Sequence, residues 1–276
     1  MKFHKFCAGM LALLAAGVVW SASDSSNQEK LAQKYEAVVD EKAAAARTML
    51  PAEVQPQAPA PKPQQRQALT PQQWSKTLAG MPQAEVFQGF SVHSKHFCSS
   101  CHGKQGLANT PNWPDVAGQP SAVTIKALLD YREGRRKGTP AADLMTAAVA
   151  KLSDQEIVDV AALYEYLPGR GSDRQAAPLA SAPKLVLKGD PARMVTPCAA
   201  CHGTSARGNP NGQVPVLYGQ QDSAIETALR DYRSGARTSD MLMEMRQFSK
   251  ALTDEEIKEL ARWYAGQPGR PAQEQK

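Results

Sequence analysis

Two copies of one short pattern constrain this chain more than any other feature of its sequence. The pentapeptides Cys98-Ser99-Ser100-Cys101-His102 and Cys198-Ala199-Ala200-Cys201-His202 contain four of its five cysteines. In each unit two thiols stand three residues apart, and a histidine directly follows the second thiol. On one turn of a helix, two sulfurs and an imidazole at this spacing lie close enough to hold a single bound group.

The spacing matches the attachment signature of c-type haem. Two sulfurs can form thioethers with the two vinyl groups of one porphyrin, while the adjacent imidazole ligates the iron. Other assignments fit less well, since a structural zinc site needs four ligands and a thioredoxin-like thiol pair needs a βαβ context that the sequence lacks. We therefore expect two covalently attached haem c groups, held by Cys98, Cys101 and His102 and by Cys198, Cys201 and His202.

The two units belong to a longer duplication with a period of 100 to 101 residues. Segments 127–136 and 228–237 agree at seven of ten positions, and segments 152–170 and 252–270 agree at nine of 19. Neither copy has strand alternation of useful length. The sequence therefore predicts an all-α chain with two tandem domains of about 80 residues each.

Helix signals in each copy predict only a small core. We expect a helix over 121–132, another that begins at each cysteine pair, and a last helix opened by a capping box at Ser153 or Thr253. On the last helix the side chains expected to face the interior are Ile157, Val160, Ala161 and Tyr164, and Ile257, Leu260, Ala261 and Tyr264. Three short helices with long loops make a poor core unless a large apolar group fills the centre.

Each iron needs a sixth ligand, or it keeps an open site for chemistry. Met145 is the one methionine in the loop expected between the 121–132 helix and the last helix of the first copy. Met245 stands at the matching position of the second copy, so register favours it over Met241 and Met243, although either neighbour fits as the ligand. His/Met ligation raises the reduction potential and closes the coordination sphere, which favours electron transfer over oxygen or peroxide chemistry.

Other residues near the motifs have expected roles as well. His93 and His96 are rival ligands for the first iron, but they are expected on the same helix as Cys98, where they would lie at the surface or near the propionates. Pro114 and Pro215 are expected to place a carbonyl that accepts the proximal imidazole N–H and fixes the ring. Simple loop prolines are the alternative reading of both.

Taken together, these motifs resemble the dihaem cytochrome c4 family of class I cytochromes. They are the paired CxxCH units, the proline followed by Gly-Gln, the Asp-Tyr-Arg-x-Gly-x-Arg element, the loop methionine and the closing capped helix with its tyrosine. The resemblance covers about 85–269 and implies two class I cytochrome c domains, each a few helices around one covalently bound haem. It further implies a periplasmic electron carrier, not an enzyme, that links a quinol-oxidising bc-type complex to a terminal haem-copper oxidase.

Two other functions are kept as alternatives. The chain fits an electron-transfer subunit of a periplasmic dehydrogenase complex, docked through an apolar stripe formed by Leu31, Tyr35, Val38 and Val39. A dihaem peroxidase would need one five-coordinate iron, which the matched Met145 and Met245 disfavour.

The segment before the first copy predicts export. Lys2 and Lys5 precede an uncharged run over 6–20, followed by small residues, which is the layout of a secretory signal peptide. A spanning helix needs about 20 apolar residues, so both cleavage and retention as a short inner-membrane anchor fit. Thioether attachment of haem takes place outside the cytoplasm, so we expect the protein in the periplasm of a Gram-negative bacterium.

The resulting division of the chain has seven parts. In order we expect a signal peptide or short membrane anchor (1–23), an amphipathic helix (24–50), a Pro-rich extended linker (51–84), a first cytochrome c domain (85–169), an interdomain linker (170–187), a second cytochrome c domain (188–270) and a tail (271–276).

Charge excludes one class of partner. The 32 basic and 27 acidic residues give a net charge of +5, but 86–167 holds eight of each sign and 185–267 holds ten of each. A nucleic-acid surface masses basic residues on one face, so no nucleic-acid partner is expected. The basic run of Arg132, Arg135, Arg136 and Lys137 fits either a docking patch for an acidic redox partner or a structural role near helix ends and propionates. Its repetition in both copies favours the structural role.

Overall fold

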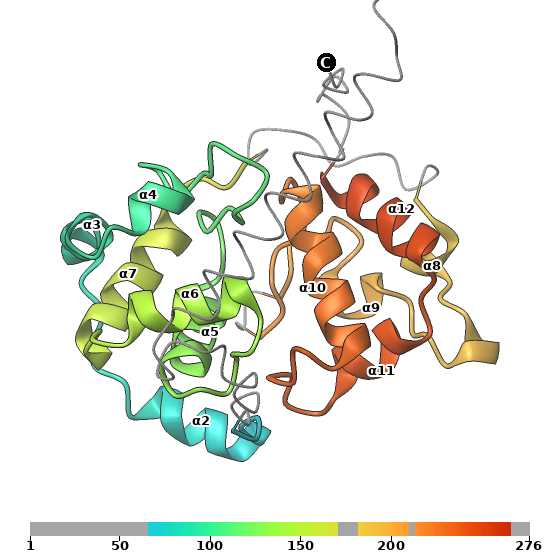
Figure 1. The fold of residues 1–276 in the computed structure, drawn as a ribbon, viewed down its shortest axis with the longest axis horizontal. Coiled ribbons are helices and arrows are strands. Elements are labelled where there is room, and N and C mark those ends of the chain that lie inside the picture. The colour runs from blue at the N-terminus through green and yellow to red at the C-terminus, as the bar shows by residue number, and fades with distance from the viewer. Residues whose placement is uncertain (1–65, 171–181, 210–212, 266–276) are drawn as a thin grey trace, which may run out of the picture. The chain divides into compact units, whose positions relative to one another are not determined.

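The structure is a computed structural model that describes residues 66–170, 182–209 and 213–265. Within these ranges the regular elements are helices, accompanied by one isolated β-bridge between Asp190 and Val195. The predicted all-α class is confirmed. Figure 1 shows the elements in two groups, one for each copy of the repeat.

The first group contains α2 (Pro71–Ala79), α3 (Val86–Lys95), α4 (Cys98–His102), α5 (Ser121–Arg132), α6 (Pro140–Val149) and α7 (Asp154–Tyr166). The second contains α8 (Lys184–Leu187), a 3-10 helix η3 (Pro191–Arg193), α9 (Ala199–His202), α10 (Asp222–Ser234), α11 (Glu244–Lys250) and α12 (Asp254–Ala265). No helix of the described ranges has the length and apolar character needed to cross a membrane.

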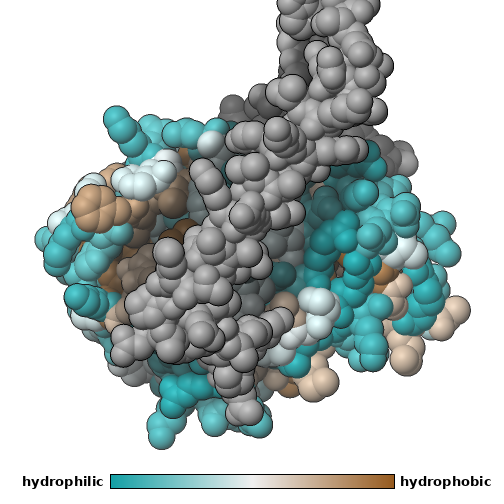
Figure 2. Space-filling view, viewed as in Figure 1, coloured by the Kyte–Doolittle hydropathy of each residue, from teal (hydrophilic) through white to brown (hydrophobic). Residues whose placement is uncertain are grey.

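Helix α7 is the centre of the first domain. It packs against both α3 and α5, and the core residues that it contributes include Ile157, Val160 and Leu163. The α3–α7 crossing is close at Gly89, where a Cβ atom would lie 2.4 Å from the Asp159 carbonyl oxygen. Only glycine allows two helix backbones to approach this closely. Among the coloured residues of Figure 2 most are hydrophilic, and hydrophobic residues are also visible in the first domain.

The predicted last helices are confirmed in both domains. Ser153 and Thr253 each accept a hydrogen bond from the backbone N–H of the glutamate three residues on, and that glutamate bonds back to the cap N–H. All eight side chains expected to face the interior are buried: Ile157, Val160, Ala161, Tyr164, Ile257, Leu260, Ala261 and Tyr264.

The Pro-rich linker expected over 51–84 is wrong for its later part. Residues Pro71–Ala79 form α2, with Thr70 as a capping-box residue and Pro71 at the first helical position. Trp74 of this helix is 0% exposed and packs in the core of the first domain. Proline at the first helical position loses no hydrogen bond, because that N–H has no partner in a helix. Residues 66–70 and 80–84 of the expected linker contain no helix. Residues 51–65, with the parts expected at 1–23 and 24–50, lie outside the described ranges.

The second domain begins differently from the first. The short helix α8 stands before its cysteine motif, and Leu185 and Val186 of that helix are buried in the second core. The expected interdomain linker over 170–187 is therefore wrong at its end, while 171–181 lie outside the described residues. Gly189, the counterpart of Gly89, lies in a turn with φ +63° instead of at a helix crossing. The end of the second domain and the tail, from 266 onward, also lie outside the described residues.

The basic residues at the end of α5 and just after it make contacts within the fold. Arg132 donates to the Leu152 carbonyl at 2.8 Å and to Asp154 at 2.7 Å, which ties the end of α5 to the start of α7. Its counterpart Arg233 donates to Leu252 and Asp254 in the same way. Arg135 forms an ion pair with Asp130. Arg136 and its counterpart Arg237 lie over the rings of Tyr131 and Tyr232. These contacts favour the structural role over a docking patch.

Candidate haem sites

Helix α4 presents the first Cys-x-x-Cys-His unit. His102 is 8% exposed, and its Nδ1 lies 2.9 Å from the carbonyl oxygen of Pro114. A carbonyl can only accept, so Nδ1 carries the proton and the lone pair of Nε2 is available to a metal. Burial lowers the pKa of His102, which favours the neutral imidazole that ligates iron.

The second unit repeats this arrangement at α9. His202 is equally buried, and its Nδ1 lies 3.1 Å from the carbonyl oxygen of Pro215. Burial lowers the pKa of His202 as well. The structure thus contains the hydrogen bond expected at each of the two prolines.

A glycine ends each of these short helices. Gly103 and Gly203 follow the histidines with φ +74° and +77°, a conformation that favours glycine. At Gly103 a Cβ atom would lie 2.0 Å from the carbonyl oxygen of Leu107. The chain therefore turns away immediately after the imidazole, which leaves the histidine at the end of the helix.

The four thiols suit thioether formation. Cys98, Cys101, Cys198 and Cys201 are all free. Burial raises the pKa of Cys98 and of Cys198. Among the described residues no three His, Cys, Asp or Glu side chains gather to hold a metal by themselves. Each site thus offers two thiols and one oriented imidazole, the donor set of a covalently bound haem.

A buried arginine atom also fits a haem. The Nε of Arg237 is buried without a hydrogen-bond partner within the described ranges. A buried guanidinium nitrogen is costly to leave unpaired, and a haem propionate is the kind of anion that would satisfy it. The residues present therefore fit the cofactor that the motifs predict.

Both rival histidines make hydrogen bonds within the first domain. His93 is 2% exposed, with Nε2 3.0 Å from the Gly103 carbonyl oxygen and Nδ1 2.9 Å from the Tyr164 hydroxyl. His96 Nε2 contacts Glu156 at 2.9 Å. The expectation that both share a helix with Cys98 is wrong. Phe97 has a left-handed backbone (φ +57°) and separates α3 from α4. His93 is buried, so it does not lie at the surface, which was one of the two positions expected for it.

The His93–Tyr164 contact was not evident from the sequence. Because the Gly103 carbonyl accepts from Nε2, Nδ1 of His93 accepts from the tyrosine hydroxyl. This joins α7 to the residue after the proximal histidine. At the matching position the second domain has Arg193, which pairs with Glu256 at 2.7 Å. The sequence did contain one indication: the repeat places His93 opposite Arg193, so this position has different residues in the two domains.

Met145 and Met245 lie on helices, so the expected loop position of Met145 is wrong. Thr139 caps α6 and Pro140 begins it. Met145 on α6 is partly buried against the first core, and Met245 on α11 is partly buried in the second domain. Met241 packs against the first domain's core, and Met243 is 57% exposed with φ +62°.

Comparison with known proteins agrees with this arrangement. The Cytochrome c family model matches residues 88–167 and 192–264. Cytochrome c4 of Thiocapsa roseopersicina is 30% identical over 196 residues, which are 68% of this chain and 96% of that protein. The thiosulfate dehydrogenase electron acceptor of Thiomonas intermedia (strain K12) is 29% identical over 178 residues, 63% of this chain and 80% of that protein.

A solved structure matches at the level of the fold. The crystal structure of reduced recombinant cytochrome c4 from Pseudomonas stutzeri superposes with a TM-score of 0.59 at 29% identity, over 67% of this chain and 100% of that one. The two haem-binding units, the duplicated helical domains and these relatives lead to one conclusion. The chain belongs to the dihaem cytochrome c4 family, whose members carry two covalently attached haem c groups and act as electron carriers, not as enzymes.

Proposed function

We propose that His102 and His202 are the proximal ligands of the two irons, with Met145 and Met245 as the sixth ligands. The two cysteines before each histidine form the thioethers. Among the three neighbouring methionines of the second domain, Met241 is already packed against the other domain and Met243 is exposed. Met245 is the remaining one, and its register matches Met145.

The chemistry of these ligands suits electron transfer. When bound, each haem supplies a one-electron iron couple, and a methionine opposite a histidine raises its potential. The protein holds each proximal imidazole neutral and in one tautomer through a proline carbonyl. Because these rings are buried and fixed, little rearrangement would accompany a change of oxidation state.

In the cell, the proposed role is to carry electrons through the periplasm from a quinol-oxidising bc-type complex to a terminal haem-copper oxidase. The observation that carries it is the pair of equivalent, buried and oriented imidazoles, which make two carriers in one chain. The test is kinetic: the purified dihaem protein is mixed with the bc-type complex and quinol, and then with the oxidase. Reduction by the first and oxidation by the second are expected. Failure of either step would exclude that partner.

A dehydrogenase is the alternative electron donor. Two relatives carry the name thiosulfate dehydrogenase electron acceptor, so the same assay is run with thiosulfate dehydrogenase and thiosulfate in place of the bc-type complex. Faster reduction by the dehydrogenase would assign this chain to that alternative. An inner-membrane tether through 1–23 is a separate proposal, tested by whether the full-length protein remains with membranes after a high-salt wash.

A further inference from the structure

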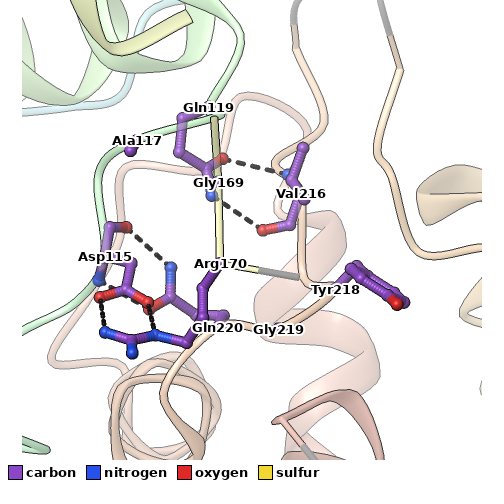
Figure 3. A pocket seen from close by; sticks show the side chains of 9 residues that line it. All are labelled: Asp115, Ala117, Gln119, Gly169, Arg170, Val216, Tyr218, Gly219 and Gln220. Carbon is purple, nitrogen blue, oxygen red and sulfur yellow. Dashed lines mark hydrogen bonds and ion pairs between the residues drawn. The ribbon is translucent and has the colours of Figure 1, made fainter. Parts of the chain in front are cut away.

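Two glutamines join the domains in a matched way. Gln119 of the first domain donates to the Val216 carbonyl at 2.9 Å and accepts from the Val216 N–H at 3.1 Å. Gln220 of the second domain makes the same two bonds with the backbone of Asp115, both at 2.8 Å. Figure 3 shows the two pairs side by side. In the repeat Gln119 matches Gln220 and Asp115 matches Val216, so the contacts are related by an approximate two-fold symmetry.

In each pair, the bond that the glutamine oxygen accepts comes from a peptide group that also holds a proximal histidine. The carbonyl of Pro114 accepts from His102, and the N–H of the same peptide group belongs to Asp115, which donates to Gln220. In the second domain, the peptide group after Pro215 accepts from His202 and donates to Gln119. One peptide therefore separates each proximal imidazole from a glutamine of the other domain.

Such a chain of hydrogen bonds is cooperative. When a peptide N–H donates, its carbonyl oxygen becomes a stronger acceptor. A stronger acceptor at Nδ1 makes the imidazole a more basic ligand, which favours ferric over ferrous iron. Each glutamine is therefore expected to lower the reduction potential of the haem in the opposite domain.

The surrounding residues hold this contact in place. Gly219, next to Gln220, has φ +72°, and a Cβ there would lie 2.1 Å from the Arg170 carbonyl oxygen. The Asp115 carboxylate is held by Arg170 at 2.6 Å and by the Ala108 N–H at 2.7 Å. The cavity between these residues has about 20 Å³, room for about one water molecule.

We propose that Gln220 and Gln119 are crossed positioning residues, in which Gln220 tunes the haem of the first domain and Gln119 tunes the haem of the second. The inference rests on the proposed ligation by His102 and His202. It gives each domain a direct way to sense whether the other is docked, since separation of the domains would remove both glutamine bonds.

The test compares Gln220→Met and Gln119→Met in the dihaem protein, each keeping a side chain of similar length. Potentials are measured by spectroelectrochemical titration, and the Nδ1–H resonances of His102 and His202 by NMR of the reduced, ¹⁵N-histidine-labelled protein. Gln220→Met is expected to raise the potential of the first haem and move the His102 resonance toward that of a weaker hydrogen bond. Gln119→Met is expected to do the same to the second haem and His202.

Ser223→Ala is the matched control, because it removes an interdomain hydrogen bond to the Pro111 carbonyl that does not end on either histidine-bearing peptide. It is expected to leave both potentials unchanged. A shift confined to the mutated glutamine's own domain, equal shifts in all three variants, or no shift in correctly folded variants would each overturn the inference. Failure of the proposed ligation is recognised separately, because the wild-type spectrum would then lack two low-spin haems with axial histidine.

Discussion

At the scale of single residues, one carbonyl oxygen sets the tautomer and orientation of each proximal imidazole. The Pro114 and Pro215 oxygens accept from Nδ1, so Nε2 is the nitrogen left for iron. The CxxCH pattern predicts the histidines and the register of the repeat predicts the prolines, because these contacts follow from local spacing. The two bonds of His93 could not be predicted, since one of its partners, Tyr164, is 71 residues away.

The choice among the three methionines of the second domain gives the first prediction. Met245→Leu is expected to abolish the sulfur-to-iron charge-transfer band of one of the two ferric haems and to lower its potential. Met241→Leu and Met243→Leu are the matched controls and should keep both bands, because these side chains pack elsewhere or point to solvent. Loss of the band in either control, with retention in Met245→Leu, would assign the ligand to that neighbour.

The capping glutamate of α7 gives a prediction about pH. The Ser153 N–H and then His96 lower the pKa of Glu156 from its usual 4.5 to about 2. Because the folded-state pKa is depressed, the stabilisation is complete above about pH 4.5 and is lost as the pH falls toward 2. Glu156→Gln should therefore be less stable than the wild type near neutral pH, and the gap should narrow on acidification. Urea unfolding at several pH values measures it, and a pH-independent gap would contradict the assignment.

At the scale of elements, prolines account for the main differences between expectation and structure. Pro71 and Pro140 each stand at the start of a helix behind a capping threonine. Proline interrupts a helix from inside but is favourable at its first position. The segments that form α2 and α6 were therefore interpreted as a proline-rich linker and a loop. The helix α5 was predicted with its observed bounds. The bounds of α5 could be predicted because its apolar pattern and the repeated Asp-Tyr-Arg element lie within the helix itself.

The role of α2 in the first domain gives the next prediction. Trp74→Ala should destabilise that domain by about 3–5 kcal/mol, the usual cost of truncating a buried aromatic residue. Trp74→Phe keeps most of the apolar volume and should cost clearly less. Chemical denaturation followed by the first domain's haem absorbance measures both. Equal stability of Trp74→Ala and the wild type would show that α2 is dispensable and that the domain begins after it.

The α3–α7 crossing gives a paired glycine test. Gly89→Ala would place a methyl group 2.4 Å from the Asp159 oxygen and 2.6 Å from the Leu163 Cβ, so the helices must separate at a cost of about 1–3 kcal/mol. Gly80→Ala is the control, since a Cβ there meets nothing closer than 3.6 Å, and it should change stability by no more than about 0.5 kcal/mol. Thermal unfolding compares the two variants, and equal effects would contradict the close crossing.

At the scale of the whole molecule, duplication is visible in the sequence but the asymmetry of the two domains is not. The register of the repeat aligns Gly89 with Gly189, yet one lies at a helix crossing and the other in a turn. The sequence likewise shows two Gly-Gln elements without indicating that each glutamine bonds across to the other domain. Contacts between domains depend on how two surfaces meet, which local patterns do not encode. Through those contacts each proximal histidine is linked by hydrogen bonds to a glutamine of the other domain.

The most direct test of the central claim is a spectroelectrochemical titration of the purified protein with the methionine-to-iron charge-transfer band recorded in parallel. Two covalently bound haems, each held by one histidine and one methionine, should give two low-spin, high-potential centres that both show this band. A high-spin or low-potential component would contradict that ligation and return the peroxidase alternative to consideration.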